Sequence, residues 1–347
     1  MRLYFAPMEG ITGLVCRNAY EACFSGSIEK YFAPFITATV QKAVSAKELR
    51  DILPENNKVP YLVPQILANQ PDAFIKTAEA ITSLGYKEIN LNLGCPSRTV
   101  VTKKKGAGFL EFPHQVDGFL SEVCEWTEKQ GIRFSVKTRL GMSDEEEFWE
   151  LLEVYNKYPL CELIVHPRLQ EDYYVKPVHA DVFKRAEKLS KNPLCYNGDI
   201  FDDGKLKKFA EANQEQTCVM IGRGFLMHPG MGRIVDESGQ MPAVESAADV
   251  SGKVPAFVGA DTEYPAVTKS EAVAHDDLWK FHDAVYEGYC DYIQGDKNML
   301  FKMKELWSYM CVNFDDSDAQ VKKALKQLRK SQSRADYEMA VRQLRRM

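Results

Sequence analysis

The sequence lacks several features that would each mark a class of protein. No apolar run approaches the ~18 residues that a membrane-spanning helix requires, and the start of the chain does not have the basic and apolar segments of a secretory signal peptide. The nine cysteines are odd in number and include no CxxC pair. That pattern argues against a disulfide framework and against a thiolate zinc site. We therefore expect a cytoplasmic protein with reduced thiols, without a metal and without a membrane attachment.

Two common phosphate-binding signatures are also missing. Neither a Walker sequence nor a GxGxxG occurs, which argues against a P-loop and against a Rossmann nucleotide site. The formal net charge of −5 does not by itself indicate a nucleic-acid partner. What the chain does have is length and ordinary apolar content. Its 347 residues, 45% of them hydrophobic, suit one large barrel or two domains with a sizeable core.

The chain is organised around the stretch Glu88–Leu93. Apolar residues alternate there with asparagines, which is the period of a strand with one packed and one polar face. Gly94 and Pro96 end this strand, because proline has no donor for a ladder hydrogen bond. Cys95 is thereby placed in the loop beyond the strand, with Asn92 directed towards the same end. A lone cysteine is more often simply buried. Here Asn92, Gly94 and Pro96 surround the cysteine, and they favour a thiol that is accessible and takes part in chemistry.

Short strand-like runs alternate with helical stretches through residues 1–235. The eight predicted strands are Leu3–Ala6, Tyr31–Phe35, Val59–Leu67, Glu88–Leu93, Arg133–Arg139, Glu162–His166, Pro193–Asn197 and Cys218–Gly222. This pattern predicts a (β/α)₈ barrel, the TIM-barrel fold of the α/β class. Polar residues or glycines follow nearly every strand, and active sites of this fold lie at the carboxyl ends of the strands.

The amino-acid composition of the sequence changes after the predicted barrel. Residues 236–275 are rich in Ser, Gly, Pro, Ala and acidic residues without a sustained period, which predicts a linker or insertion. Residues 276–347 predict a small C-terminal helical bundle. Its predicted helices are Asp277–Ile293, Asp296–Val312, Ser317–Lys330 and Ser333–Met347. Capping boxes are expected at Ser143 with Glu146, Ser317 with Gln320, and Ser333 with Asp336.

Several residues at the strand ends suit a phosphate-bearing heterocycle. Gly198, Gly222 and Gly224 follow the last two strands with Arg223 among them, where such barrels commonly bind phosphate. Glycines alone are weak evidence, since turns need them too. Lys137 lies within an apolar strand, where an unpaired ammonium is costly, so we expect it to face an anion or a ring that becomes anionic.

Seven segments, in order and spacing over the whole barrel, resemble the tRNA-dihydrouridine synthases. They are Ala6–Gly10, Gln65, Asn92–Ser97, Lys137–Gly141, His166–Arg168, Asn197–Ile200 and Ile221–Gly224. Met303–Met310 is more loosely similar to the helical-domain signature of that family. The resemblance implies FMN as cofactor, NADPH as electron donor, and reduction of the 5,6 double bond of particular uridines in tRNA.

The resemblance also assigns roles to single residues. It implies that Cys95 is the proton donor to carbon 5 of the uracil, and that Asn92 and Arg139 contact the substrate base. The implied flavin contacts are Pro7, Met8, Glu9, Gln65, Lys137, His166, Asn197, Gly198, Asp199, Gly222 and Arg223. Two segments depart from the family pattern: the long stretch 236–273, and the unusually basic loop Lys103–Gly106.

The residue types agree with that chemistry. A hydride delivered to carbon 6 leaves enolate-like charge that requires a proton at carbon 5. A thiol of ordinary pKa, about 8.5, is mostly protonated at neutral pH and can supply it as a general acid. Lys137 would stabilise the anionic reduced ring. The target uridine must leave its base stack to reach the site.

The C-terminal helices carry an unusual concentration of positive charge. Val321–Met347 contains nine Lys or Arg and two acidic residues, a net +7 within a chain of net −5. Apolar residues recur there at i, i+3, i+4 and i+7, leaving the basic residues to face outward. The alternative is a charged face that is merely exposed to solvent. Charge of one sign on an acidic protein instead favours a surface that binds tRNA phosphates. We expect this surface to include Lys322, Lys326, Arg329 and Lys330.

Two other functions remain open from sequence. One is another FMN barrel oxidoreductase of the dihydroorotate dehydrogenase kind, which would not need a basic helical appendage. The other is a tRNA-binding or chaperone protein that keeps the barrel without turnover, and the absence of flavin absorbance would favour it. The sequence does not identify the uridine that is modified. We expect a monomer whose partners are tRNA and NADPH.

Overall fold

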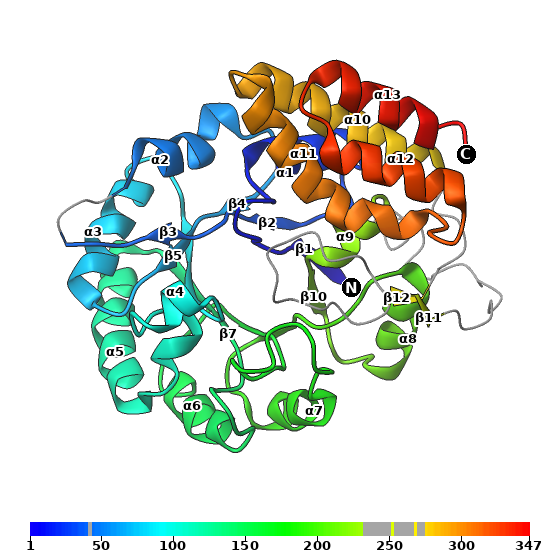
Figure 1. The fold of residues 1–347 in the computed structure, drawn as a ribbon. Helices are drawn as coiled ribbons and strands as arrows, with labels where there is room; N and C mark the ends of the chain where they lie inside the picture. The colour runs from blue at the N-terminus through cyan, green and yellow to red at the C-terminus, as the bar shows by residue number, and fades with distance from the viewer. Residues whose placement is uncertain (41–43, 232–250, 253–266, 269–274) are drawn as a thin grey trace. The chain divides into compact units, whose positions relative to one another are not determined.

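The computed structural model describes residues 1–40, 44–231, 251–252, 267–268 and 275–347 (Figure 1). It divides into two compact units. The first contains Met1–Glu9, Glu29–Asp199 and Asn213–Ile221, and the second contains Gly10–Ile28, Ile200–Ala212 and Gly222–Met347. The units interleave along the chain, so the ranges 1–235, 236–275 and 276–347 stay a prediction. Most of the predicted linker lies outside the described residues; within it, β11 (Ser251–Gly252) pairs antiparallel with β12 (Val267–Thr268).

A parallel sheet of short strands forms the first unit. Its strands are β1 (Arg2–Phe5), β2 (Lys30–Phe32), β3 (Ile36–Thr37), β4 (Leu62–Val63), β5 (Gln65–Leu67), β6 (Glu88–Leu93), β7 (Arg133–Thr138), β8 (Glu162–Val165), β9 (Leu194–Tyr196) and β10 (Cys218–Ile221). Their order in the sheet is β3-β5-β6-β7-β8-β9-β10-β1-β2-β4. Each of the eight predicted strands is found. The predicted Val59–Leu67 is divided into β4 and β5, whereas the predicted Tyr31–Phe35 is found as β2, and β3 begins just beyond its predicted end.

The two ends of this sheet join to close a barrel. β2 and β3 are successive pieces of one stretch of chain, and β4 and β5 are separated only by Pro64, which has no N–H to donate. Backbone hydrogen bonds connect the two stretches, from Ala33 N to Val63 O at 3.0 Å and from Ala38 N to Leu67 O at 3.0 Å. The ten pieces therefore form eight parallel strands in a closed ring, and the predicted (β/α)₈ barrel is confirmed.

Most helices of the first unit lie outside its sheet, along the left and lower sides in Figure 1. The helices of this unit are α2 (Ala46–Ile52), α3 (Pro71–Thr82), α4 (Arg98–Val101), α5 (Pro113–Gln130), α6 (Glu147–Tyr155) and α7 (Ala180–Leu189), with 3₁₀ turns η1 (Pro54–Asn56) and η2 (Gly106–Phe109). Pro71 opens α3, because its missing N–H is one that a first helical turn leaves unpaired anyway. The predicted capping box of α6 is wrong. The carboxylate of Glu147, not that of Glu146, turns back to accept from the backbone N–H of Met142 (2.6 Å) and Asp144 (3.0 Å).

A buried ion cluster closes the amino-terminal end of the barrel. Lys30, Glu88 and Glu162 are the first residues of β2, β6 and β8, and all three are buried. The ammonium of Lys30 lies 2.9 Å from a carboxylate oxygen of Glu88 and 3.4 Å from one of Glu162. Tyr4 donates to Glu162 at 2.7 Å, and Tyr61 donates to Glu88 at 3.1 Å. Burial alone would lower the pKa of Lys30, but the two carboxylates outweigh it and raise that pKa.

The second unit is helical. It contains α1 (Leu14–Cys23), α8 (Asp203–Ala212), α9 (Arg223–Met227), α10 (His275–Tyr292), α11 (Asp296–Met310), α12 (Ala319–Lys330), α13 (Arg334–Leu344) and the turn η4 (Cys311–Asn313). The four predicted C-terminal helices are confirmed as α10 to α13. Ser333 caps α13 as predicted, accepting from Asp336 N at 3.2 Å. The cap predicted at Ser317 is wrong, because Asp318 accepts from Gln320 N at 2.6 Å and α12 begins later than expected.

Aromatic rings fill the interior of the helical unit. Tyr20 on α1 packs against Phe225 on α9 and Phe281 on α10, with ring centroids 5.3 and 5.6 Å apart. Trp307 on α11 is fully buried and donates to the hydroxyl of Tyr337 on α13 at 2.8 Å. These contacts join α1 and α9 to the C-terminal helices. None of the helices in the described part of the chain combines the length and the apolar character that crossing a bilayer needs.

Candidate active site at the carboxyl ends of the strands

Cys95 lies in the loop beyond β6, as the sequence predicted. The side-chain oxygen of Asn92 accepts from the backbone N–H of Gly94 at 3.0 Å and of Cys95 at 2.9 Å. Asparagine commonly turns the chain in this way. The thiol is half-buried, and burial, with a smaller contribution from the charge of Glu9, raises the pKa of Cys95. The thiol therefore remains protonated at neutral pH, the state that a proton donor needs.

A second contact holds Cys95 from the other side of its loop. Ala107 donates its backbone N–H to the carbonyl of Cys95 at 3.0 Å. Gly106 has φ +55°, and a Cβ added to it would lie 2.9 Å from the Cys95 carbonyl oxygen and 3.0 Å from the Cys95 Cβ. Glycine is required at this position on both grounds. The basic loop that follows Cys95 is thus packed directly on it.

A ladder of amide side chains crosses the barrel below this loop. Asn92 donates to Gln65 at 2.7 Å, Gln65 donates to Asn90 at 2.7 Å, and Asn90 donates to Ser135 at 2.8 Å. All four side chains are buried, and they come from β5, β6 and β7. The ladder fixes the amide of Asn92 and, through it, the turn at Cys95. Contacts of Gln65 with a flavin and of Asn92 with the base stay predictions.

Lys137 is a half-buried cation near the end of β7. Among the residues that the structure describes, its ammonium has no hydrogen bond and no ion pair. Desolvation, with a smaller contribution from the nearby charge of Arg139, lowers the pKa of Lys137 to about 8. Because a desolvated ammonium is costly, this arrangement favours a ligand that brings a hydrogen-bond acceptor or negative charge.

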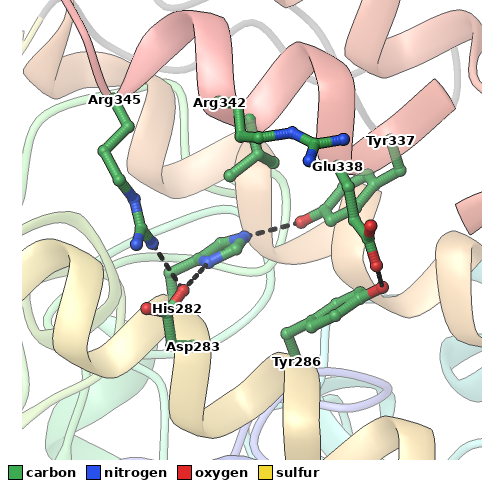
Figure 2. A pocket seen from close by; sticks show the side chains of 8 residues that line it. His282, Asp283, Tyr286, Tyr337, Glu338, Arg342 and Arg345 are labelled. Atoms are coloured by element: carbon green, nitrogen blue, oxygen red, sulfur yellow. Dashed lines mark hydrogen bonds and ion pairs between the residues drawn. The ribbon is translucent and has the colours of Figure 1, made fainter. Parts of the chain in front are cut away.

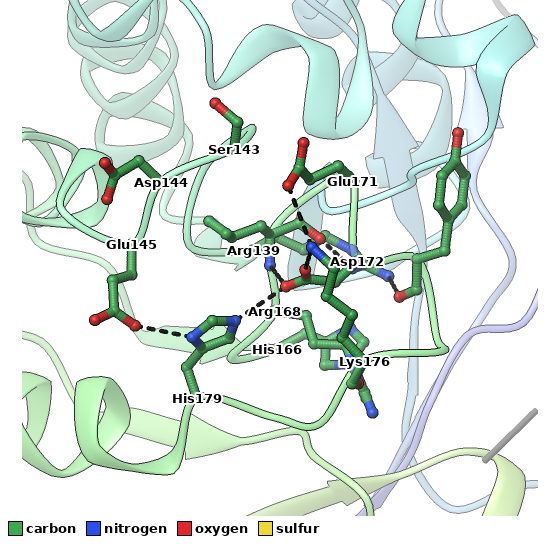
Figure 3. A network of polar contacts seen from close by, with 12 residues as sticks. Arg139, Ser143, Asp144, Glu145, His166, Arg168, Glu171, Asp172, Lys176 and His179 are labelled. Atoms are coloured by element: carbon green, nitrogen blue, oxygen red, sulfur yellow. Dashed lines mark hydrogen bonds and ion pairs between the residues drawn. The ribbon is translucent and has the colours of Figure 1, made fainter.

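Arg139 connects the Cys95 loop to the loop after β8. Figure 3 shows Arg139 beside residues of the second of these loops, among them Glu171 and Asp172. Its fully buried guanidinium donates to the carbonyls of Gly94 (3.0 Å), Leu169 (2.7 Å) and Tyr173 (2.8 Å), and it lies over the ring of Tyr174. Burial lowers the pKa of Arg139, which nonetheless stays charged. These bonds give Arg139 a positioning role in the described structure. Its predicted contact with the substrate base stays a prediction.

His166 and Asp199 are both tied to Arg168. A guanidinium nitrogen of Arg168 lies 3.0 Å from Nε2 of His166, and a guanidinium can only donate. Nε2 is therefore the acceptor, and the proton of this neutral imidazole is on Nδ1. Arg168 also binds both carboxylate oxygens of Asp199, one of them at 2.7 Å. The pairing restrains two predicted flavin contacts through a residue to which sequence reasoning had assigned no role.

The glycine after β9 has a packing explanation. A Cβ at Gly198 would lie 2.0 Å from the hydroxyl oxygen of Tyr196, so that side chain occupies the space. Asn197 donates its side-chain amide to the carbonyl of Met220 at 2.8 Å and so ties β9 to β10. Both observations concern the frame of the site. Flavin contacts of Asn197 and Gly198 stay predictions.

The remaining predicted contacts follow β1 and β10 in the chain. Pro7 and Met8 are half-buried and Glu9 is exposed. Gly222 and Arg223 belong to the second unit, where the Arg223 guanidinium lies 4.8 Å from the centroid of the Phe201 ring. The roles of these residues at a flavin stay predictions.

The basic helix α12 has the amphipathic form that the sequence predicted. Val321, Ala324, Leu325 and Leu328 are buried. The predicted tRNA contacts, Lys322, Lys326, Arg329 and Lys330, are exposed on its other side. The amphipathic arrangement is confirmed, and the tRNA contact stays a prediction.

A cavity of about 220 Å³ lies between α10 and α13 (Figure 2). Its polar side chains bind one another: His282 is hydrogen-bonded to Asp283 at 2.9 Å and to Tyr337 at 2.8 Å, and Tyr286 donates to Glu338 at 2.8 Å. The network joins the two helices. Sequence reasoning did not identify it, because its members are up to 56 positions apart and form no local pattern.

Comparison with known proteins adds a family and several relatives. Residues 4–262 match the family described as dihydrouridine synthase. The chain is 28% identical over 230 residues to the probable tRNA-dihydrouridine synthase 2 of Bacillus subtilis, covering 65% of this chain and 69% of that protein. It is 26% identical over 239 residues to the tRNA-dihydrouridine(16) synthase of Pseudomonas putida, covering 67% and 72%. A solved old yellow enzyme homologue from Zymomonas mobilis gives a TM-score of 0.48 at 10% identity, covering 70% and 90%.

Proposed function

The chain belongs to the dihydrouridine synthase family, and from this membership we propose that it reduces a uridine in tRNA to dihydrouridine. FMN is the proposed cofactor, NADPH the electron donor and cytoplasmic tRNA the substrate. The observation that carries the proposal is the setting of Cys95. Its thiol has a raised pKa and is held at the end of β6. The same unit contains the ammonium of Lys137, which has no partner among the described residues.

Two residues of the barrel unit, Lys137 and His166, fit the ring of a flavin. Lys137 offers an ammonium with no partner among the described side chains, and the pyrimidine edge of a flavin carries the acceptors that such a group needs. Nε2 of His166 accepts from Arg168, so the ring is held by a cation and is proposed to meet the flavin as a neutral group. Arg223 is the proposed phosphate ligand, because a guanidinium matches phosphate oxygens as a forked donor.

When bound, FMN supplies the hydride that adds to carbon 6 of the uracil. Cys95 then gives its thiol proton to carbon 5, so that one hydride and one proton saturate the double bond. Burial favours this role, since it keeps the thiol protonated through neutral pH. The Lys137 ammonium stabilises negative charge that develops beside it, without reorganisation at the moment of reaction.

Three contacts keep the Cys95 loop in place during this step. Asn92 binds the backbone N–H of Cys95, Arg139 binds the carbonyl of Gly94, and Ala107 binds the carbonyl of Cys95. A misplacement of about 1 Å at a reacting atom can cost on the order of 10²-fold in rate. We assign Asn92 and Arg139 a positioning role in addition to their proposed contact with the base.

The test is direct. The purified protein should have flavin absorbance, its flavin should be reduced by NADPH, and tRNA from a strain lacking the gene should gain dihydrouridine on incubation. Mapping the missing dihydrouridine in that strain identifies the position. A protein that binds tRNA but carries no flavin and forms no dihydrouridine would refute the proposal in favour of a non-catalytic RNA-binding role. A flavoprotein that reduces dihydroorotate-type substrates instead would refute it in favour of that class.

A further inference from the structure

The segment after the catalytic thiol carries positive charge without compensation. Between Cys95 and Leu110 there are four basic residues and no acidic residue. Arg98, Lys103 and Lys104 are exposed, and among the described residues none of the three forms an ion pair. We call these three residues the loop surface. Solvated lysines are common, but one-signed charge on an acidic chain points to a polyanion.

The conformation of the loop surface is fixed. The side-chain amide of Asn69 donates to the carbonyls of both Lys103 (3.2 Å) and Lys104 (3.0 Å). Lys104 has φ +50°, a left-handed conformation that a side chain seldom adopts unless its surroundings impose it. Its ammonium lies 4.5 Å from the centroid of the Phe112 ring. The backbone that carries Lys103 and Lys104 is thus held in place, and the Lys104 ammonium has a ring contact of its own.

Lys105, unlike Lys103 and Lys104, uses its ammonium for a hydrogen bond within the protein. Its ammonium donates to the carbonyl of Ala38 at 2.8 Å and so fastens the loop to the segment after β3. Burial, with a contribution from the charge of Lys103, lowers the pKa of Lys105. We therefore leave Lys105 out of the loop surface and treat it as an anchor.

The loop surface lies next to the reacting thiol. Ala107, three residues after Lys104, donates to the carbonyl of Cys95, and Gly106 is in contact with Cys95. A uridine drawn out of its stack to reach Cys95 brings its own flanking phosphates towards this loop. We propose that Arg98, Lys103 and Lys104 bind the tRNA phosphates that flank the target uridine. The inference rests on the proposed function and gives the barrel unit its own electrostatic contact with RNA, separate from α12.

The experiment compares two triple variants of the full-length holoenzyme. The first is Arg98→Gln/Lys103→Gln/Lys104→Asn, in which asparagine tolerates the left-handed conformation. The matched control is Lys184→Gln/Lys188→Gln/Lys191→Gln, which removes the same charge from three exposed positions on and just after α7 of the same unit. The probe is a tRNA that the wild-type protein reduces, bound in a salt series and followed by fluorescence anisotropy.

Each phosphate contact contributes roughly 0.7–0.9 to the slope of log affinity against log salt. The loop variant should therefore lose about 2–3 from that slope, whereas the control keeps the wild-type slope. FMN content and flavin reduction by NADPH should be unchanged in both, which also shows that the barrel is folded. The single variant Lys103→Gln should lose about one contact's share.

The outcomes separate this inference from the proposed function. If the wild-type protein forms dihydrouridine and the loop variant keeps its tRNA affinity and salt slope, only the loop inference is overturned. An equal loss of slope in the α7 control also overturns it, because the effect would then follow net charge rather than position. If the wild-type protein forms no dihydrouridine from any tRNA tested, the proposed function fails and this inference fails with it.

Discussion

The two ends of the barrel each contain a lysine ammonium that is shielded from water, but the two ammonium groups have opposite surroundings. At the amino-terminal end, the ammonium of Lys30 lies between the carboxylates of Glu88 and Glu162, and its pKa is raised. At the carboxyl end, the ammonium of Lys137 has no partner among the described residues, and its pKa is lowered to about 8. The paired lysine therefore serves the structure, and the lysine without a described partner is the one that we propose as a ligand contact.

The comparison extends to a thiol and a guanidinium. Cys95 follows β6 and Cys161 precedes β8, and burial raises the pKa of both thiols. Arg223 follows β10, whereas Arg133 opens β7 and lies 3.2 Å from Glu88. Each pair offers a functional candidate and a matched control of the same chemical type. In barrels of this fold, residues at the amino-terminal end generally serve stability, and those at the carboxyl end serve catalysis.

The largest effect is expected from the thiols. Cys95→Ala should lower the rate of tRNA reduction by ~10²–10⁴-fold, the usual contribution of a general acid. Cys161→Ala should leave that rate within about twofold of wild type, because its thiol lies at the other end of the strands. Both variants should retain FMN and its reduction by NADPH. Stopped-flow single turnovers with tRNA measure the difference, and equal rates for the two variants would remove Cys95 from the reaction.

The lysines should separate stability from cofactor binding. Lys30→Met removes the buried cation of two buried carboxylates, leaving them only the more exposed Arg133 and Arg2. Breaking a buried ion pair costs about 3–5 kcal/mol of unfolding free energy. Lys137→Met removes a desolvated charge that has no partner among the residues that the structure describes, so stability should be unchanged or higher while FMN retention falls. Urea unfolding of the apo-proteins and flavin titration give the two readouts. A destabilised Lys137→Met of normal FMN affinity would reverse the comparison.

The two arginines should also differ, by a smaller amount, in whether their loss affects FMN binding or stability. Arg223→Ala should weaken FMN binding by roughly 1.5–3 kcal/mol, the worth of a hydrogen bond to a charged group. Arg133 is 57% exposed in its side chain, so Arg133→Ala should change stability by less than about 1 kcal/mol and leave FMN affinity unchanged. Isothermal titration of both variants with FMN decides the case. An unaltered affinity in Arg223→Ala would refute the phosphate assignment.

The parts of the fold that could be predicted are those that depend on the pattern of residues close together in the sequence. Alternation through Glu88–Leu93 predicts its strand, and the i, i+3, i+4 spacing of Val321 to Leu328 predicts the buried face of α12. Cys95 could be placed beyond its strand because Gly94 and Pro96 end the ladder. Where the local signal was ambiguous by one residue, as at Glu146 and Glu147, the prediction failed.

The pairings could not be predicted, since they join residues that are distant in the chain. Lys30 meets Glu88 from 58 positions away, and Gln65 meets Asn92 from 27. Nothing in the sequence near Arg139 shows that its donors are taken by three backbone carbonyls. A charged residue within a strand indicates that it needs a partner. Which residue is that partner becomes known only from the three-dimensional arrangement of the strands in the barrel.

The smallest effect concerns pH, and it sharpens the contrast between the two lysines. The pKa of Lys137 is lowered to about 8 in the protein without cofactor, so its ammonium is lost as pH rises through that value. FMN affinity should be constant below about pH 7 and should fall by up to about tenfold from pH 8 to 9. Lys137→Arg should bind FMN without this dependence, because arginine stays charged, and Lys137→Met should be equally flat at a lower affinity.

The stability of the apo-protein should move the other way in the same window. The unfolded chain holds a proton on Lys137 up to the ordinary pKa of about 10.4, whereas the folded protein releases it near 8. Between those values the unfolded state binds more protons, so this group makes the unfolding free energy rise with pH. Lys30 has a raised pKa and contributes the opposite sign, with stability lost as pH passes that raised value. Urea unfolding of wild type and Lys137→Met from pH 7 to 10 isolates the Lys137 contribution as the difference between two curves. If the two curves stay parallel, Lys137 does not release its proton in this range, and its ammonium is already paired in the protein without cofactor.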